Sequence, residues 1–177
     1  MTPHSRVRLA PLTAAEAAAL FATIQSSLEA LKRRLSWPSA VTTEGHCETF
    51  IAQAAEDEKA GRTLVRGIFL SKDDALIGVG SLQRLEENPG TGEVALWVRS
   101  AVEGKGYATE SGRALIALAF KERGLRRLYS RIDPTNRGAR KVLLRLGFNY
   151  EGCLRRERRL NGRWIDQECW GLIKEEA

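Results

Sequence analysis

The 177-residue chain is poor in the residues that build disulfide frameworks and metal sites. It has three cysteines, Cys47, Cys153 and Cys169, which lie far apart and leave one unpaired, and two histidines, His4 and His46. There is no Cys-x-x-Cys pair and no His/Cys cluster. We therefore expect neither a disulfide-stabilised secreted fold nor a structural zinc site, and we expect no metal cofactor.

Long apolar runs are also missing. No segment approaches the roughly 20 apolar residues that a membrane-spanning helix needs. The first charges lead only into a short apolar stretch at 7–12, which is too short for the core of a secretory signal. With 43% hydrophobic and 28% charged residues the composition is that of a globular protein. We expect one domain over residues 1–177, located in the cytoplasm and not bound to a membrane.

Positive charge is concentrated in the second half. Residues 1–98 hold 10 Lys and Arg against 12 Asp and Glu, a net charge of −2. Residues 99–177 hold 18 against 10, a net charge of +8. The second half is therefore either a solvated basic face or the part that meets an anion such as a phosphate-bearing ligand or a nucleic acid.

The spacing of apolar residues changes along the chain from helical to strand-like and back. A capping box at Thr13–Glu16 predicts the first helix, and Asn161-Gly162 predicts a hairpin. The other predicted helices cover 44–59, 107–123 and 137–146; the predicted strands cover 7–12, 63–70, 76–82, 93–98, 125–132, 148–154 and 164–173. The strands between 63 and 98 indicate a meander. The sequence thus predicts an α/β (α+β) fold with a mostly antiparallel sheet.

A Gly-x-Gly turn joins the strand ending at Val98 to the helix beginning at Tyr107. Gly104 and Gly106 lack Cβ, so their backbone can adopt positive φ and approach a ligand closely. The helix start adds unpaired N–H groups and a partial positive charge, which suits a pyrophosphate. The spacing fits neither a P-loop nor a dinucleotide fingerprint. A plain glycine turn that starts a helix is the alternative.

The segment Gly104-Lys105-Gly106-Tyr107-Ala108-Thr109-Glu110 resembles the coenzyme A pyrophosphate loop of the GNAT superfamily of N-acetyltransferases. Other segments occur in the order seen in its ribosomal-protein (RimJ/RimL-type) branch. They are 9–13, Trp37-Pro38, 67–69, 76–78, 93–98, 133–136, 146–148, 151–152 and 161–162. The resemblance therefore covers nearly the whole chain.

This resemblance implies a central strand pair, 93–98 and 125–132, that splays apart, with a bulge in the first strand. The pantetheine arm of acetyl-CoA would lie in the gap against the main chain of Trp97 and Val98. The pyrophosphate would be held by six consecutive residues, Gly104, Lys105, Gly106, Tyr107, Ala108 and Thr109. Asn136 would hydrogen-bond the pantetheine, and Arg140 and Lys141 would either meet phosphates or form a solvated helix face.

Three positions depart from the family pattern. Glu103 stands where the loop usually begins with Arg or Gln, which is adverse near a pyrophosphate. Ala139 replaces a serine that would protonate the departing thiolate. Ala95 stands where the branch tends to have glycine, which bears on the implied bulge.

The resemblance also implies where the acceptor amine binds. Glu93 is the candidate catalytic base, because an amine must lose a proton to react; the alternative is a surface glutamate in a salt bridge. Trp37 would form an apolar wall for the acceptor, whereas we assign Phe50 to the core. The basic segment 155–163 is interpreted as a charged hairpin that deters edge pairing. Hairpins of this kind also form dimer contacts in related enzymes, so a homodimer is one option.

Three functions remain open at this stage. The first is acetyl-CoA-dependent N-acetylation of a protein N-terminal α-amine, as on a ribosomal protein, with nucleic acid met only indirectly through the ribosome. The second is acetylation of a small amine, such as a polyamine, an amino acid or an aminoglycoside, which Glu86, Glu87 and Glu93 would favour. The third is a non-catalytic CoA-binding protein, suggested by Glu103 and Ala139.

Overall fold

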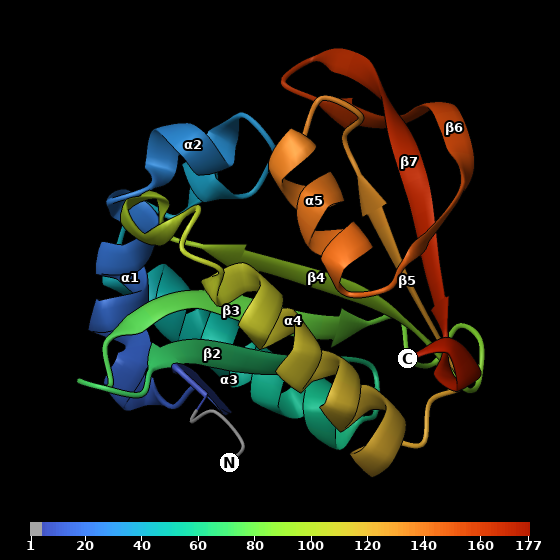
Figure 1. Ribbon diagram of the computed structural model, residues 1–177. Coiled ribbons are helices and arrows are strands. Elements are labelled where there is room, and N and C mark those ends of the chain that lie inside the picture. Colours follow the sequence, from blue (N-terminus) through green and yellow to red (C-terminus); the bar gives the residue numbers. More distant parts are fainter. Residues whose placement is uncertain (1–4) are drawn as a thin grey trace.

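The computed structural model describes residues 5–177 (Figure 1). Its framework is a seven-stranded sheet with the strand order β1-β2-β3-β4-β5-β7-β6. The strands are β1 (Val7–Ala10), β2 (Leu64–Leu70), β3 (Leu76–Gln83), β4 (Thr91–Val98), β5 (Arg127–Ile132), β6 (Asn149–Leu160) and β7 (Arg163–Ile173). Every neighbouring pair is antiparallel except β4 and β5, which are parallel. The predicted mixed, mostly antiparallel sheet is confirmed.

The central parallel pair splays apart. Only 91–93 of β4 pair with β5, opposite 127–129, and the remaining residues of β4 pair with β3 alone. In Figure 1 the two strands diverge from their common start, with α5 beside β5 and α2 near the other end of β4. We call this arrangement the fork. It confirms the splayed pair that the resemblance implies.

The implied bulge in β4 is wrong. β4 pairs with β3 without a register shift from Glu93 to Val98. Ala95 does not adopt a positive φ, whereas one common type of bulge needs a glycine in the left-handed region. β3 and β4 also lie very close together at this point, because a Cβ added to Gly78 of β3 would lie 2.1 Å from the carbonyl oxygen of Trp97 in β4.

Helices cover both faces of the sheet (Figure 1). On one face lie α1 (Ala17–Gln25), α2 (Leu28–Lys32) and α3 (Glu44–Lys59); on the other lie α4 (Tyr107–Ala117) and α5 (Arg137–Arg145). Leu20, Ile51 and Val79 belong to the first core, and Leu82 and Leu115 to the second. Val79 and Leu82 both come from β3, so the alternation of side chains along a strand supplies both layers.

Local signals in the sequence set several boundaries. The capping box forms as predicted: Glu16 Oε2 accepts from the Thr13 N–H at 2.7 Å, and Thr13 Oγ1 accepts from the Ala15 N–H at 3.3 Å. It begins a short 3₁₀ turn that leads into α1. The α3 bounds match the predicted 44–59. Asn161 and Gly162 both have positive φ and join β6 to β7, as a tight hairpin turn requires.

Two predicted elements differ in extent. The helix predicted over 107–123 is α-helical only to Ala117 and continues as a π-helical segment, Leu118–Glu122. β6 runs to Leu160 instead of ending at Leu154, because its arginine-rich half pairs with β7 although its residues do not alternate between apolar and polar. None of the helices within residues 5–177 combines the length and the hydrophobicity that a membrane-spanning helix requires.

Candidate active site

The turn between β4 and α4 has the backbone that the sequence predicts. Gly104 has a φ of +74° and Gly106 a φ of +87°. A Cβ added at Gly104 would meet no atom within 4 Å, so conformation and not space requires glycine there. The N–H of Glu110 donates to the Gly106 carbonyl at 3.1 Å, and the N–H groups before it have no partner within the helix. The turn therefore presents backbone donors together with the positive end of α4.

Side chains at the turn differ in how accessible they are. Lys105 is exposed, and its Nζ donates to the Ala101 carbonyl at 3.1 Å. Tyr107 and Ala108 are half-buried, whereas Thr109 is only 6% exposed. Lys105 is thus the predicted side chain best placed to meet an anion in solvent, and the turn depends mainly on its backbone.

Arg6 reaches this turn from the other end of the chain, which sequence reasoning missed. Its Nη2 donates to the Lys105 carbonyl at 3.1 Å, its Nε donates to Glu110 Oε1 at 2.7 Å, and its guanidinium lies 4.9 Å from the Tyr107 ring centroid. The hydrogen bond to Glu110 raises the pKa of Arg6. No local pattern signals a contact between residues about a hundred positions apart. By its ion pair Arg6 compensates the negative charge of Glu110 beside a turn in which Glu103 is already adverse.

The fork leaves one side of β4 without a partner strand. Trp97 and Val98 pair with Val79 and Gly78 of β3, and β5 has already turned away from them. An extended ligand can therefore lie along this side of β4 and form main-chain hydrogen bonds as an added strand would. The structure places Trp97 and Val98 at the gap, where the resemblance expects the pantetheine arm.

Glu93 stands where the strands part. It pairs with Tyr129 in the last residue pair between β4 and β5. Its side chain is 16% exposed, and its Oε2 lies 3.0 Å from Nε of Arg84. Burial, and then the nearby Glu93, raise the pKa of the Tyr129 hydroxyl, so it stays protonated at neutral pH. Glu93 is thus in the salt bridge that the sequence offered as one alternative, and it also lies beside the fork. Its role as a base stays a prediction.

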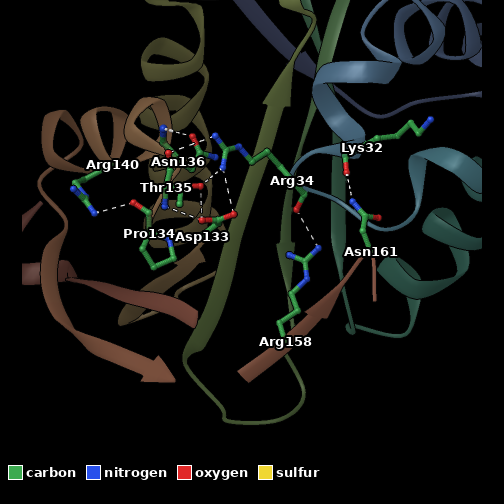
Figure 2. A network of polar contacts seen from close by, with 10 residues as sticks. Lys32, Arg34, Asp133, Pro134, Thr135, Asn136, Arg140, Arg158 and Asn161 are labelled. Atoms are coloured by element: carbon green, nitrogen blue, oxygen red, sulfur yellow. Dashed lines mark hydrogen bonds and ion pairs between the residues drawn. The ribbon is translucent and has the colours of Figure 1, made fainter. Parts of the chain in front are cut away.

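Three more predicted residues lie at the end of the loop from β5 to α5 and on α5 itself; Figure 2 shows Asn136 and Arg140. Asn136 caps α5, since its Oδ1 accepts from the Ala139 N–H at 3.1 Å. Arg140 donates from Nη2 to the Pro134 carbonyl at 3.0 Å, and its Nε is 3.2 Å from Glu168 Oε2. That carboxylate is 8% exposed, so Arg140 neutralises a buried charge. Lys141 is exposed on α5.

Trp37 and Phe50 are the two aromatic side chains considered for the acceptor side. The ring centroids of Trp37 and Trp97 are 6.1 Å apart, and Trp37 is 39% exposed. The structure therefore places Trp37 beside the fork. The assignment of Phe50 to the core is wrong: it is 43% exposed and lines a shallow cavity between α3 and the sheet, while its neighbour Ile51 fills the core. Helical periodicity did not separate these adjacent positions.

The residues between 5 and 177 contain no cluster of three or more His, Cys, Asp or Glu side chains that could hold a metal ion. The candidate site consists of backbone donors at the glycine turn, the unpaired side of β4, Glu93 at the fork and aromatic side chains next to it.

Comparisons with known proteins agree with this geometry. A family model described as Acetyltransferase (GNAT) domain matches residues 6–149. The chain is 30% identical to the ribosomal-protein-serine acetyltransferase of Escherichia coli (strain K12) over 143 residues, which cover 81% of this chain and 79% of the relative. It is 35% identical over 108 residues to "Probable N-acetyltransferase YjcK" of Bacillus subtilis (strain 168), an alignment that spans 60% of either chain.

A solved structure is similar over almost the full length. RimL, a ribosomal L7/L12 α-N-protein acetyltransferase solved with coenzyme A, superimposes with a TM-score of 0.91 at 21% identity and covers 98% of this chain and 97% of its own. The predicted superfamily and its RimJ/RimL-type branch are confirmed by these matches. The chain belongs to the acetyltransferase (GNAT) family.

Proposed function

We propose that this enzyme transfers an acetyl group from acetyl-CoA to the N-terminal α-amine of a protein. The observation that carries the proposal is the fork, which opens at Glu93 and ends at the glycine turn before α4. One continuous path thus leads from a candidate base, along unpaired main chain, to a cluster of backbone donors. Bound acetyl-CoA would supply an activated thioester at one end of this path and a pyrophosphate at the other.

The residues fit this cosubstrate. Gly104 and Gly106 hold the positive φ angles that aim the turn's N–H groups at one place, and Lys105 is exposed beside them. Trp97 and Val98 have a free main-chain side for the pantetheine amides. Asn136 keeps its side-chain NH₂ for a ligand, because the cap of α5 uses its oxygen. Arg140 already pairs with Glu168, so we propose that it stabilises the start of α5 and does not itself bind a phosphate. We propose that the exposed Lys141 contacts a phosphate of the cosubstrate.

Acetyl transfer to an amine needs the amine in its neutral form. The amine nitrogen bonds to the thioester carbon, the carbon–sulfur bond breaks, and one amine proton must leave. We propose that Glu93 takes this proton, directly or through a water, because it is the carboxylate at the start of the fork. Positioning of the two reactants supplies the rest of the rate. The departing thiolate has no serine at position 139 to protonate it.

A protein α-amine is favoured over a small cationic acceptor. A polyamine or aminoglycoside would require uncompensated acidic charge, yet Arg84 lies 2.7 Å from Glu87 and 3.0 Å from Glu93. The α-amine has a pKa of about 7.7–8.0, lower than that of other primary amines, so less deprotonation is needed. The Escherichia coli relative's description as a ribosomal-protein acetyltransferase supports the same choice.

The test is thiol release from acetyl-CoA with a panel of N-terminal peptides and small amines. We expect turnover with peptides that have a free α-amine, and none with the same peptides blocked at the N-terminus. Turnover with polyamines or aminoglycosides but with no peptide would show that the acceptor is a small amine and not a protein N-terminus. Tight binding of coenzyme A without turnover on any amine would favour a non-catalytic protein. Sedimentation of the purified protein tests the homodimer, which stays a prediction.

A further inference from the structure

The segment that contains α2 is anchored on the β4 side of the fork. Ser27 immediately precedes α2 and is 4% exposed. Its Oγ accepts a hydrogen bond of 2.9 Å from the backbone N–H of Ser100, two residues beyond the end of β4. At the other end of the same segment, Trp37 contacts Trp97 of β4. The segment between Ser27 and Trp37 is thus fixed to β4 at two places.

Arg34 extends from this segment to the β5 side of the fork (Figure 2). Its Nη1 donates to Thr135 Oγ1 at 2.5 Å and lies 3.3 Å from Asp133 Oδ2, and its Nη2 donates to the Thr135 carbonyl at 3.4 Å. Asp133 follows directly after the last residue of β5. One guanidinium therefore spans the open end of the fork, where the two strands are no longer paired.

Both ends of this bridge are held in place. On the loop side, Asp133 Oδ1 accepts from the N–H and the hydroxyl of Thr135, each at 2.7 Å. Burial acts to raise the pKa of Asp133, but the hydrogen bonds from Thr135 and the charge of Arg34 outweigh it and lower that pKa. The backbone of the α2 segment is held by the β6–β7 hairpin, which also belongs to the β5 side of the fork: the Arg34 carbonyl accepts from Nη2 of Arg158, and the Lys32 carbonyl accepts from Nδ2 of Asn161, both at 3.1 Å. These two bonds do not use the Arg34 side chain, so they remain when that side chain is removed.

We propose that Arg34 is a positioning residue whose side chain closes a ring across the fork, between the α2 segment and the loop after β5, and thereby fixes where the acceptor amine meets the thioester. The ring runs from β4 through the Ser100–Ser27 bond and α2 to Arg34, and then through Thr135 and Asp133 to β5. It links the segment of Trp37 to the loop of Asn136. The inference rests on the proposed function, since that proposal assigns Trp37 to the acceptor and Asn136 to the pantetheine arm.

The chemistry of the contact explains why arginine is suited to it. A planar guanidinium presents several N–H donors in fixed directions and can bond three acceptors at once, which an ammonium group on a flexible stem cannot do with the same geometry. Arg34 is 37% exposed and Asp133 16% exposed at their side chains. Asp133 keeps its two hydrogen bonds from Thr135 when Arg34 is removed, so its half-buried carboxylate is not left without a partner. The expected consequence of losing Arg34 is therefore misplacement of the reactants and not unfolding.

The primary experiment compares Arg34→Ala with Arg33→Ala. Arg33 is the adjacent arginine, and its Nε donates to the Glu29 carbonyl one turn earlier at 3.1 Å, so its loss removes the same charge without opening the ring. We expect Arg34→Ala to lower kcat/KM for the acceptor about tenfold or more, while the acetyl-CoA Kd from calorimetry stays within about twofold. Arg33→Ala should match the wild type. Equal kinetics for the two variants would overturn the proposal.

Two further variants decide the matter if Arg34→Ala folds poorly. Thr135→Val removes the hydroxyl that Arg34 bonds. Arg34→Lys keeps the positive charge but loses the planar set of N–H donors. Each should lower kcat/KM, and the double variant Arg34→Lys/Thr135→Val should lose no more than the worse single one, because both changes open one ring. Losses that multiply would contradict the ring. If the wild-type enzyme acetylates a small amine but no peptide, the proposed acceptor is refuted. The Arg34 variants are then compared with the wild type on that small amine, which tests the ring separately.

Discussion

Glu93 and Tyr129 form the last residue pair between β4 and β5, and the strands separate immediately beyond them. The pair places a carboxylate and a phenol at the start of the gap. Tyr129 is kept protonated by burial and by Glu93, while Arg84 holds the Glu93 carboxylate from the other side. Acetyl transfer to an amine needs an acceptor for the amine proton, and Glu93 is the carboxylate that the fork itself positions.

Glu93→Gln should lower kcat about a hundredfold at pH 7, because the amide cannot accept the amine proton. The loss should shrink as the pH rises through about 8, where the α-amine deprotonates by itself. Glu87→Gln is the matched control, since it removes the other carboxylate that pairs with Arg84. Steady-state kinetics across pH 6–9 provides the measurement, and equal rates for both variants would exclude Glu93 as the base.

Gly104 and Gly61 offer a matched pair of substitutions. Their φ angles are +74° and +73°, and an added Cβ meets nothing within 4 Å at either position. Each change to Ala should cost about 1 kcal/mol of unfolding free energy, because L-residues disfavour this conformation. Only Gly104→Ala should weaken coenzyme A binding, by about tenfold. Gly61 follows α3 and is not part of the turn between β4 and α4. Equal CoA affinities in the two variants would show that the turn is merely a helix start.

Arg6→Ala should raise the Kd of coenzyme A about threefold to tenfold, because Arg6 bonds the Lys105 carbonyl and because its loss leaves the charge of Glu110 uncompensated beside the turn. The effect should diminish at high salt. Arg8→Ala is the control: Arg8 pairs with Asp74 and stacks on Phe69, away from the turn. Calorimetric titrations at two salt concentrations measure both, and an unchanged Kd for Arg6→Ala would remove it from the site.

The pH dependence of stability should include a contribution from Glu58. The hydrogen bond from Arg66 lowers the pKa of Glu58, and burial opposes this shift only in part. A carboxyl whose folded pKa is depressed stabilises the fold above its unfolded pKa of about 4.3, and this stabilisation is lost as the pH falls through the folded pKa. Glu58→Gln should therefore lower Tm at pH 7 and flatten the fall of Tm between pH 5 and pH 3. A Tm curve parallel to that of the wild type would contradict this assignment.

Local sequence signals correctly predicted the helix ends, caps and turns that depend on residues adjacent in the chain. The α3 bounds, the capping box at Thr13 and the Asn161-Gly162 turn each follow from residues within a few positions. The positive φ values of Gly104 and Gly106 were predicted for the same reason. The arrangement of the fork followed from the resemblance, because single-strand patterns do not show where two strands stop pairing.

Contacts between distant segments escaped prediction. Arg6 meets the turn at Lys105, and Arg34 meets Thr135, across separations of about a hundred residues. The prediction of a bulge in β4 was wrong because it was taken from the family resemblance, whereas this strand has Ala95 in the place of glycine and pairs regularly with β3. The extent of β6 was missed because strand pairing with β7, and not apolar alternation, holds the segment beyond Leu154.

The proposed function requires that the glycine turn and the open side of β4 together hold coenzyme A. An NMR titration that follows backbone amide shifts measures this binding residue by residue. We predict saturable changes at Val98 and over 104–109 on addition of coenzyme A, and none at Gly61 or Gly162. Spectra that stay unchanged at millimolar coenzyme A, or changes confined to the cavity beside Phe50, would contradict the account.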